Sequence, residues 1–384
     1  MLLSNPVLNE LRITLLRFTL LALDRVGLPS FSGSTFRGAF GAEFRRIACI
    51  PLCHDANTCM MAAQCAYARI FEAKPVKEGY TPAGDAGLPR PFVIHPPVGR
   101  MDIEPGEQFT FHMALVGWAA DYIPYFILAW RELGRAGLGR GRGRFKLERV
   151  ESCAAIDLQS HETPTTLIYS REDELVRNSL ERLTAEQLLS LHPALGSKNG
   201  GPSARIEAAS PASSEPVSNI TPSDSANGAP NFQRRLSIEM VTPLRLKSNG
   251  EFLRSDLPFT VLAGALIRRL ESLSFFYGRG PLGLDYAALM EQSRDIRTIS
   301  TELRWVEWER YSSRQDRRVP WGGLLGRAEY EGDFLTFFPF LALAEIVGVG
   351  NNCVFGLGRL RLDGSATGNL PALAHNGARE LELK

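Results

Sequence analysis

Residues 333–362 read DFLTFFPFLALAEIVGVGNNCVFGLGRLRL, and this stretch decides the fold. Its apolar run over residues 334–347 predicts a helix, and the alternation over residues 359–362 predicts a strand. The loop between them carries Gly348, Gly350, Asn351, Asn352, Gly356 and Gly358. Glycine adopts positive φ readily and lets the backbone come close to another surface. With Arg359 beside it, a loop of exposed N–H groups is predicted to hold a phosphate backbone.

The order of these elements restricts what the loop can bind. Dinucleotide and P-loop sites run strand, glycine loop, helix, so that the phosphate meets a helix N-terminus. Here the helix precedes the glycines and the strand follows them, which argues against a nucleotide cofactor. The alternative, an ordinary glycine cap and turn without a ligand, stays open.

The first half of the chain repeats this pattern. Residues 121–133 predict a helix and residues 145–150 a strand, and GRAGLGRGRGR at residues 134–144 joins them. This loop offers four candidate phosphate ligands, Arg135, Arg140, Arg142 and Arg144. Two such loops at matching places indicate an internal duplication.

Composition is typical of a globular protein with room for two cores. The chain has 384 residues, of which 44% are hydrophobic and 22% charged. A net charge of +1 gives no global sign of a nucleic-acid partner, but seven of residues 131–149 are Arg or Lys, and such a local stripe can bind phosphates. The chain shows no signal peptide and no stretch long enough to cross a bilayer, so we expect a cytoplasmic protein with reduced or metal-bound cysteines.

Several motifs resemble those of one known family. They are TPLRLKSNG at residues 242–250, GSTFRGAFGAEFRR at residues 33–46, a cysteine cluster at residues 49–65 and the glycine loops. Together they resemble the CRISPR-associated endoribonucleases of the Cas6 family, in the RAMP superfamily, which process precursor crRNA in antiviral defence. The resemblance covers both halves of the chain but not the segment between them, and the final glycine loop is its most specific part.

The expected fold is α+β, with two tandem ferredoxin-like (RRM-like) βαββαβ domains and a C-terminal glycine-rich loop. Strands are predicted at residues 11–24, 92–95, 108–116 and 145–156 around helices 35–47 and 121–133. The second set has strands 236–246, 301–312, 323–330 and 359–362 around helices 259–274 and 334–347. We expect domains at residues 1–195 and 232–384, joined by a low-complexity linker at residues 196–231.

Four cysteines follow the first predicted helix. Cys49, Cys53, Cys59 and Cys65 are separated by three, five and five residues. Four thiols in one short polar insertion can close a tetrahedral structural zinc site, and His54 is able to replace one of them. The alternative is a set of small buried residues without a metal. No cofactor is expected for catalysis.

Basic residues mark further candidate RNA contacts. Arg37, Arg45 and Arg46 fall away from the apolar stripe of the first helix, and Arg268 lies on the helix at residues 259–274. Arg310, Arg314, Arg317 and Arg318 form a basic knot at a predicted hairpin tip that is suited to gripping an RNA stem. A solvated helix face and a solvated turn are the respective alternatives.

The resemblance implies metal-independent RNA cleavage. A ribose 2′-OH attacks the adjacent phosphate, which leaves a 2′,3′-cyclic phosphate and a 5′-OH. Many family members use a histidine near the end of the first helix, but residues 35–47 contain no His, Tyr or Lys. Three options remain open: His54 reaches the site as the base, the arginines (Arg37 and Arg46 first among them) stabilise charge while geometry carries the reaction, or the protein binds without cutting.

The sequence therefore favours an endoribonuclease that cleaves CRISPR repeat RNA. The alternative is a non-catalytic crRNA-binding subunit of a CRISPR effector complex. A third hypothesis is a zinc-stapled scaffold for a protein partner.

Overall fold

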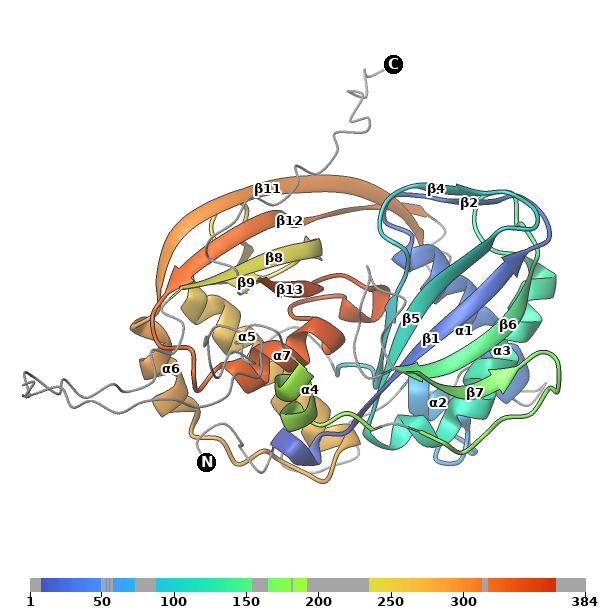
Figure 1. The fold of residues 1–384 in the computed structure, drawn as a ribbon, viewed down its shortest axis with the longest axis horizontal. Coiled ribbons are helices and arrows are strands. Elements are labelled where there is room, and N and C mark those ends of the chain that lie inside the picture. The colour runs from blue at the N-terminus through green and yellow to red at the C-terminus, as the bar shows by residue number, and fades with distance from the viewer. Residues whose placement is uncertain are drawn as a thin grey trace, which may run out of the picture.

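The computed structural model describes residues 8–49, 53, 55, 58–72, 88–153, 165–180, 182–191, 235–312 and 317–363. It has two lobes (Figure 1), each built on an antiparallel sheet. The elements of the first half are η1 (Leu8–Glu10), β1 (Ile13–Ala22), β2 (Val26–Leu28), α1 (Gly33–Ala48), α2 (Ala66–Phe71), β3 (Phe92–His95), β4 (Met101–Ile103), β5 (Gln108–Val116), η2 (Gly117–Tyr122), α3 (Ile123–Ala136), β6 (Phe145–Cys153), β7 (Thr165–Ser170) and α4 (Ala185–Leu191).

The N-terminal lobe consists of β1 to β7 with α1, α2 and α3. Its sheet has the order β3-β5-β1-β6-β7, so β1 lies between β5 and β6, and all neighbours pair antiparallel. The connection from β1 through α1 to β3 passes over one strand of the sheet, and so does the connection from β5 through α3 to β6. This is the arrangement of a ferredoxin-like βαββαβ unit. Phe18 of β1, Phe40 of α1 and Trp130 of α3 share one buried cluster, which holds the helices against one face of the sheet.

The C-terminal lobe repeats the arrangement. Its elements are β8 (Arg235–Leu244), β9 (Lys247–Ser248), β10 (Glu251–Phe252), α5 (Phe259–Tyr277), α6 (Tyr286–Arg294), β11 (Arg297–Ser312), β12 (Arg317–Glu331), α7 (Phe338–Val347), η3 (Cys353–Phe355) and β13 (Leu360–Asp363). The sheet order β11-β12-β8-β13 matches that of the first four strands of the other lobe. The expected α+β class is confirmed, and the two helix–glycine loop–strand segments occupy equivalent places. The sequence had not indicated α2, α6 or the short pairs β2–β4 and β9–β10.

The two lobes share a core. Ile13, Leu15 and Val93 of the first sheet belong to the same buried cluster as α5 and α7, and α4 of the first half packs on α7. Tyr277 also donates a hydrogen bond across the junction to the Pro89 carbonyl, at 2.6 Å. The lobes are therefore fixed to one another, and the domain boundaries set at residues 195 and 232 remain predictions because the linker lies outside the described residues.

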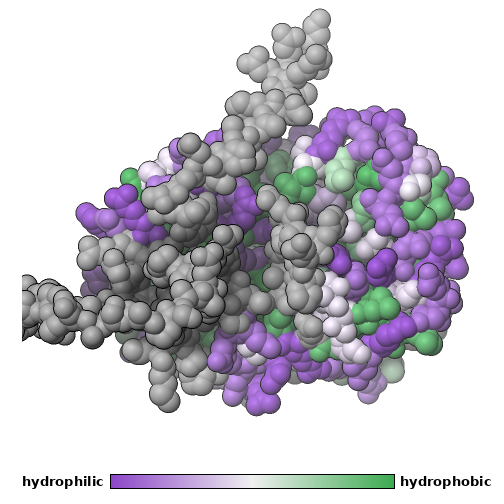
Figure 2. All heavy atoms as spheres, viewed as in Figure 1, coloured by the Kyte–Doolittle hydropathy of each residue, from purple (hydrophilic) through white to green (hydrophobic). Residues whose placement is uncertain are grey.

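Within the described residues, no helix is long and apolar enough to span a membrane. Hydrophilic residues predominate over the part of the N-terminal lobe that is visible in Figure 2.

Two neutral histidines at the junction make the fold sensitive to acid. His95 pairs with His112 across β3 and β5, and His95 Nε2 lies 2.7 Å from the Ile346 carbonyl oxygen, to which it donates. Burial, with Arg359 and Arg17 adding to it, lowers the pKa of His112 to about 3. Burial, then Arg359, also lowers the pKa of His95.

We expect stability to fall on acidification below the ordinary histidine pKa of about 6.5. Between about pH 6.5 and 3 these histidines bind protons in the unfolded chain but not in the folded chain, so the free energy of unfolding declines. Urea unfolding at a series of pH values measures this, and His112→Gln should flatten the slope. An unchanged slope in that variant would assign the acid sensitivity to other groups.

Candidate functional site

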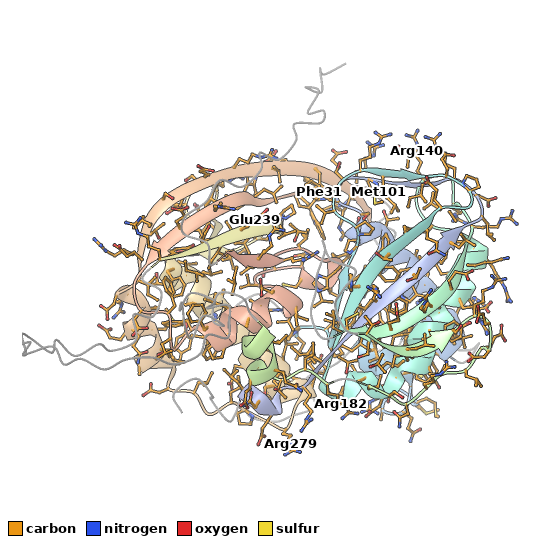
Figure 3. All side chains as sticks on the ribbon, in the orientation of Figure 1. Phe31, Met101, Arg140, Arg182, Glu239 and Arg279 are labelled. Carbon is orange, nitrogen blue, oxygen red and sulfur yellow. The ribbon has the colours of Figure 1, made fainter. Side chains whose placement is uncertain are left out.

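A groove lies where the lobes meet. Residues 30–34 at the start of α1 and residues 96–98 after β3 form its N-terminal side. Residues 241–242 of β8, Trp308 and Trp321 of the long β11–β12 hairpin, and residues 355–357 form the other side. The hairpin arches from the C-terminal lobe over to the N-terminal one (Figure 1), and Phe31 lies near that meeting point (Figure 3).

Glycines allow the close contact that builds this groove. A Cβ on Gly33 would lie 1.7 Å from the Phe355 carbonyl oxygen, and one on Gly356 would lie 2.5 Å from the Ile94 carbonyl oxygen. Only a residue without a side chain fits at either place. The final glycine loop thereby seats η3 on the N-terminus of α1.

Arg37, one turn into α1, is held beneath the groove by aromatic rings. Its guanidinium carbon lies 4.3 Å from the centroid of Phe71, 5.7 Å from that of Phe92 and 5.9 Å from that of Phe355. Burial lowers the pKa of Arg37 to about 10, which leaves it charged at neutral pH. Its Nε atom is buried and has no hydrogen-bond partner among the described residues.

Arg310 of β11 shares the Phe355 ring with Arg37, and Arg245 lies beside the neighbouring Trp321 ring. The Arg310 guanidinium lies 4.4 Å from the Trp321 centroid and 5.2 Å from the Phe355 centroid. Arg245 lies 5.6 Å from the Trp321 ring and donates to the Gly322 carbonyl. Burial lowers the pKa of both arginines, and each has a buried Nε without a partner in the described part of the chain.

These cations together form a candidate anion site. Arg310 is one of the charges that lower the pKa of Arg37, and both guanidinium groups lie beside the Phe355 ring. Buried donors without partners carry a free-energy cost that a bound anion would relieve. The phosphate of a nucleic acid matches this demand, because guanidinium groups bind its oxygens through charge-assisted hydrogen bonds.

The other arginines of α1 lie away from this site. Arg46 follows Arg37 by nine residues, which is roughly 13 Å along a helix at about 1.5 Å per residue. Arg46 is exposed and pairs with Glu43 at 2.8 Å. Arg45 lies over the Tyr67 ring, 5.7 Å from its centroid. Arg37 and Arg46 thus lie well apart along α1, and the prediction that both serve one catalytic site stays a prediction.

Several N–H groups of the final glycine loop, which was predicted to expose them, are engaged within the protein. Gly348 N donates to the Ala344 carbonyl, Asn351 N to that of Arg245, Gly356 N to that of Cys353 and Gly358 N to that of Pro243. The positive φ values of Gly348, Gly350, Asn352, Gly356 and Gly358 serve this tight packing. The loop builds the junction, and its contribution to an RNA site stays a prediction.

Two further arginines that were predicted to contact RNA make contacts within the protein. Arg359 is only 5% exposed, and its backbone N–H donates to Thr242 Oγ1 at 3.0 Å, so it belongs to the interior. Arg268 is exposed but donates to Tyr286 Oη at 2.6 Å, on the far helix pair α5 and α6. The predicted contact of Arg359 with RNA stays a prediction.

The first glycine loop remains a cationic projection. Arg140 N donates to the Gly27 carbonyl at 3.0 Å, which ties the loop to β2, three residues before the groove begins. Arg135 pairs with Glu132 and Arg144 with Asp24, each as an exposed pair. Arg140 and Arg142 are exposed, and Arg140 points outward at the edge of the lobe (Figure 3).

The cysteine insertion is partly described. Burial, then Cys65 and Cys53, raises the pKa of the Cys49 thiol to about 12, so these three thiols are neighbours. Among the residues that the structure describes, no group of three His, Cys, Asp or Glu side chains is arranged to hold a metal. The zinc site with Cys59 therefore remains a prediction. His54 and Arg314 lie outside the described residues, while Arg317 and Arg318 are exposed on β12.

Sequence reasoning missed most of the groove. Arg245 lies within TPLRLKSNG, but nothing in the pattern showed that its guanidinium would meet Trp321. Phe31, Trp308 and Phe355 were also not singled out. The alternating RWVEWERY of residues 304–311 was the available signal, since it places Trp308 and Arg310 on one face of a strand.

The comparisons agree with this architecture. Residues 238–360 match the family model described as CRISPR-associated endoribonuclease Cas6, and residues 11–181 match a model described as an N-terminal domain. An uncharacterized protein of Archaeoglobus fulgidus is 24% identical over 340 residues, covering 87% of this chain and 92% of that protein.

Two solved structures are similar to this chain. A chain of a partial Cas6-RT-Cas1–Cas2 complex is 15% identical with a TM-score of 0.50, over 94% of this chain and 47% of that one. Thermus thermophilus Cas6 is 14% identical with a TM-score of 0.46, over 92% of this chain and 98% of that one.

Proposed function

We propose that this chain, whose residues 238–360 match the family model of the CRISPR-associated endoribonuclease Cas6, cleaves CRISPR repeat RNA within precursor crRNA. The single observation that carries the proposal is the inter-lobe groove, with Arg37 and Arg310 both beside the ring of Phe355, which lines it. In both arginines the buried Nε atom has no hydrogen-bond partner among the described residues, as expected of donors that would bind a phosphate.

The proposed reaction is internal attack by the ribose 2′-OH. A bond forms between O2′ and phosphorus while the bond from phosphorus to O5′ breaks, and the 2′ proton is lost as O5′ gains one. The products are a 2′,3′-cyclic phosphate and a 5′-OH. The nucleophile belongs to the substrate, so the step requires no metal-activated water.

Arg37 and Arg310 are proposed to stabilise the charge that grows on the phosphorane oxygens. Donors already fixed in a partly dry site act more strongly than donors in water, because they need no reorganisation as the charge develops. The aromatic rings hold both guanidinium planes in place. Positioning of the 2′-OH in line with the leaving oxygen supplies the remainder.

Arginines outside the groove are proposed to bind the flanking RNA. Arg140 and Arg142 of the first glycine loop and Arg317 and Arg318 of the hairpin are exposed. Contacts of this kind neutralise phosphates and make affinity fall as salt rises. They are proposed to position the RNA without reading its sequence.

The proposal is tested by incubating the protein with its cognate repeat RNA in EDTA. We expect a single cut that leaves a cyclic phosphate, detected by its resistance to phosphatase until acid opens the ring. Tight, salt-sensitive binding without a cut would replace the enzyme by the crRNA-binding subunit of an effector complex. Absence of binding at low salt would overturn both.

A further inference from the structure

The groove has aromatic walls that a phosphate site does not need. Phe31 and Trp308 lie with ring centroids 4.6 Å apart and planes tilted by 39°. Trp321 stands edge-on to Trp308 at 6.0 Å and to Phe355 at 5.2 Å.

One polar group in this groove is left unsatisfied. Ser32 is 1% exposed, and its Oγ has no hydrogen-bond partner among the described residues. Thr242, by contrast, donates to the Gly356 carbonyl at 2.8 Å and accepts from Arg359 N at 3.0 Å. A buried hydroxyl without a partner is costly, so Ser32 is placed to meet a polar edge of whatever enters.

The groove is also continuous with the anion site. Phe355 lines the groove and carries both guanidinium groups on its ring, Arg37 at 5.9 Å and Arg310 at 5.2 Å. The sixteen-residue helix α1 begins beside Ser32, and its N-terminus adds partial positive charge there. A ligand that fills the whole arrangement has a flat aromatic part, a hydrogen-bonding edge and an anionic group close by.

A single nucleotide has this composition. We propose that the groove receives one unstacked nucleobase of the RNA, next to the phosphate held by Arg37 and Arg310. The inference rests on the proposed function and narrows its substrate class to RNA with an unpaired nucleotide at the cleavage position. The base lies against Trp308 and Phe31, and Ser32 hydrogen-bonds to its edge.

Stacking and reaction geometry both favour an unpaired nucleotide over a paired one. Within a duplex the faces of a base are covered by its neighbours, so aromatic side chains reach only bases that are splayed out. Withdrawing the base also frees the ribose from helical geometry, which allows the 2′-OH to align with the leaving oxygen. The groove would thus select the cleavage position and prepare it for reaction.

A double-mutant cycle between Trp308 and the base tests this proposal. The probe is synthetic repeat RNA with 2′-deoxyribose at the cut position, which blocks cleavage, and a single abasic nucleotide moved along the repeat. Affinity is measured by fluorescence anisotropy. We expect Trp308→Ala to weaken binding of the intact RNA by about 10- to 100-fold, in line with base–aromatic stacking, and to have little effect when the abasic nucleotide is beside the cut.

The controls separate a structural role from stacking. Phe31→Leu keeps an apolar side chain without the ring and should show the same dependence, which guards against misfolding of Trp308→Ala. Tyr125→Ala changes an exposed ring on α3, 42% exposed, and should bind all RNAs normally. If Trp308→Ala loses the same affinity wherever the abasic nucleotide stands, the groove does not bind the base beside the cut. If the parent protein binds RNA without cleaving it and the double-mutant cycle gives the expected result, the base-binding groove is supported and the proposed nuclease activity is rejected. Absence of binding would overturn both proposals.

Discussion

Arg310→Gln should lower the single-turnover cleavage rate of repeat RNA by about 10²–10³-fold, which is the loss typical of removing one fixed donor to a developing oxyanion. Arg310 lies 5.2 Å from the Phe355 ring, across from Arg37, and has a free Nε in the described structure. Glutamine keeps much of the side chain's bulk over Trp321 but removes the charge. The measurement is a time course with enzyme in excess over labelled RNA.

Two matched variants define what that loss means. Arg310→Lys keeps the positive charge but loses the planar fork, so we expect an intermediate rate. Arg294→Gln removes an exposed arginine of α6 that pairs with Glu291, and its rate should equal that of the parent. If Arg310→Gln cleaves at the parental rate, the phosphate does not lie between the two arginines.

Gly33→Ala should destabilise the protein by about 3 kcal/mol or more, at the upper end of the cost of overpacking. The added Cβ would lie 1.7 Å from the Phe355 carbonyl oxygen, and that atom belongs to backbone that has no rotamer to change. The lobes must separate locally for the methyl group to fit, so cleavage should fall along with stability. Urea unfolding measures the first effect.

Gly38→Ala is the matched control in the same helix. No atom lies within 4 Å of a Cβ built on Gly38, and alanine in an exposed helix gains about 1 kcal/mol over glycine. We therefore expect a slightly more stable protein with parental activity. Equal effects of the two substitutions would show that α1 responds to alanine itself and not to contact with η3.

Local pattern was sufficient to predict the elements of both sheets. The alternation of β5 and the apolar run of α7 depend on neighbours a few residues away, and both elements appear near the expected bounds. The duplicated order of elements then restricts the topology, because connections between strands are short and of one hand.

The site was predictable only in part, because it depends on how the two lobes pack. Arg37 and Arg310 are separated by most of the chain, and only the seating of η3 on α1 brings them to one ring. The same holds for the glycine loop, because several of its N–H groups donate to carbonyls such as those of Arg245 and Pro243. Sequence spacing shows that donors exist, while tertiary contacts decide whether they are free.

The shared core has a consequence for synthesis on the ribosome. The N-terminal sheet emerges first, and its face with Ile13, Leu15 and Val93 is covered in the finished protein by elements that include α7. That apolar face therefore stays open until residues 338–347 have been translated. Folding therefore cannot be completed one lobe at a time. The nascent chain exposes this apolar surface through most of its translation, which makes it a candidate client for chaperones.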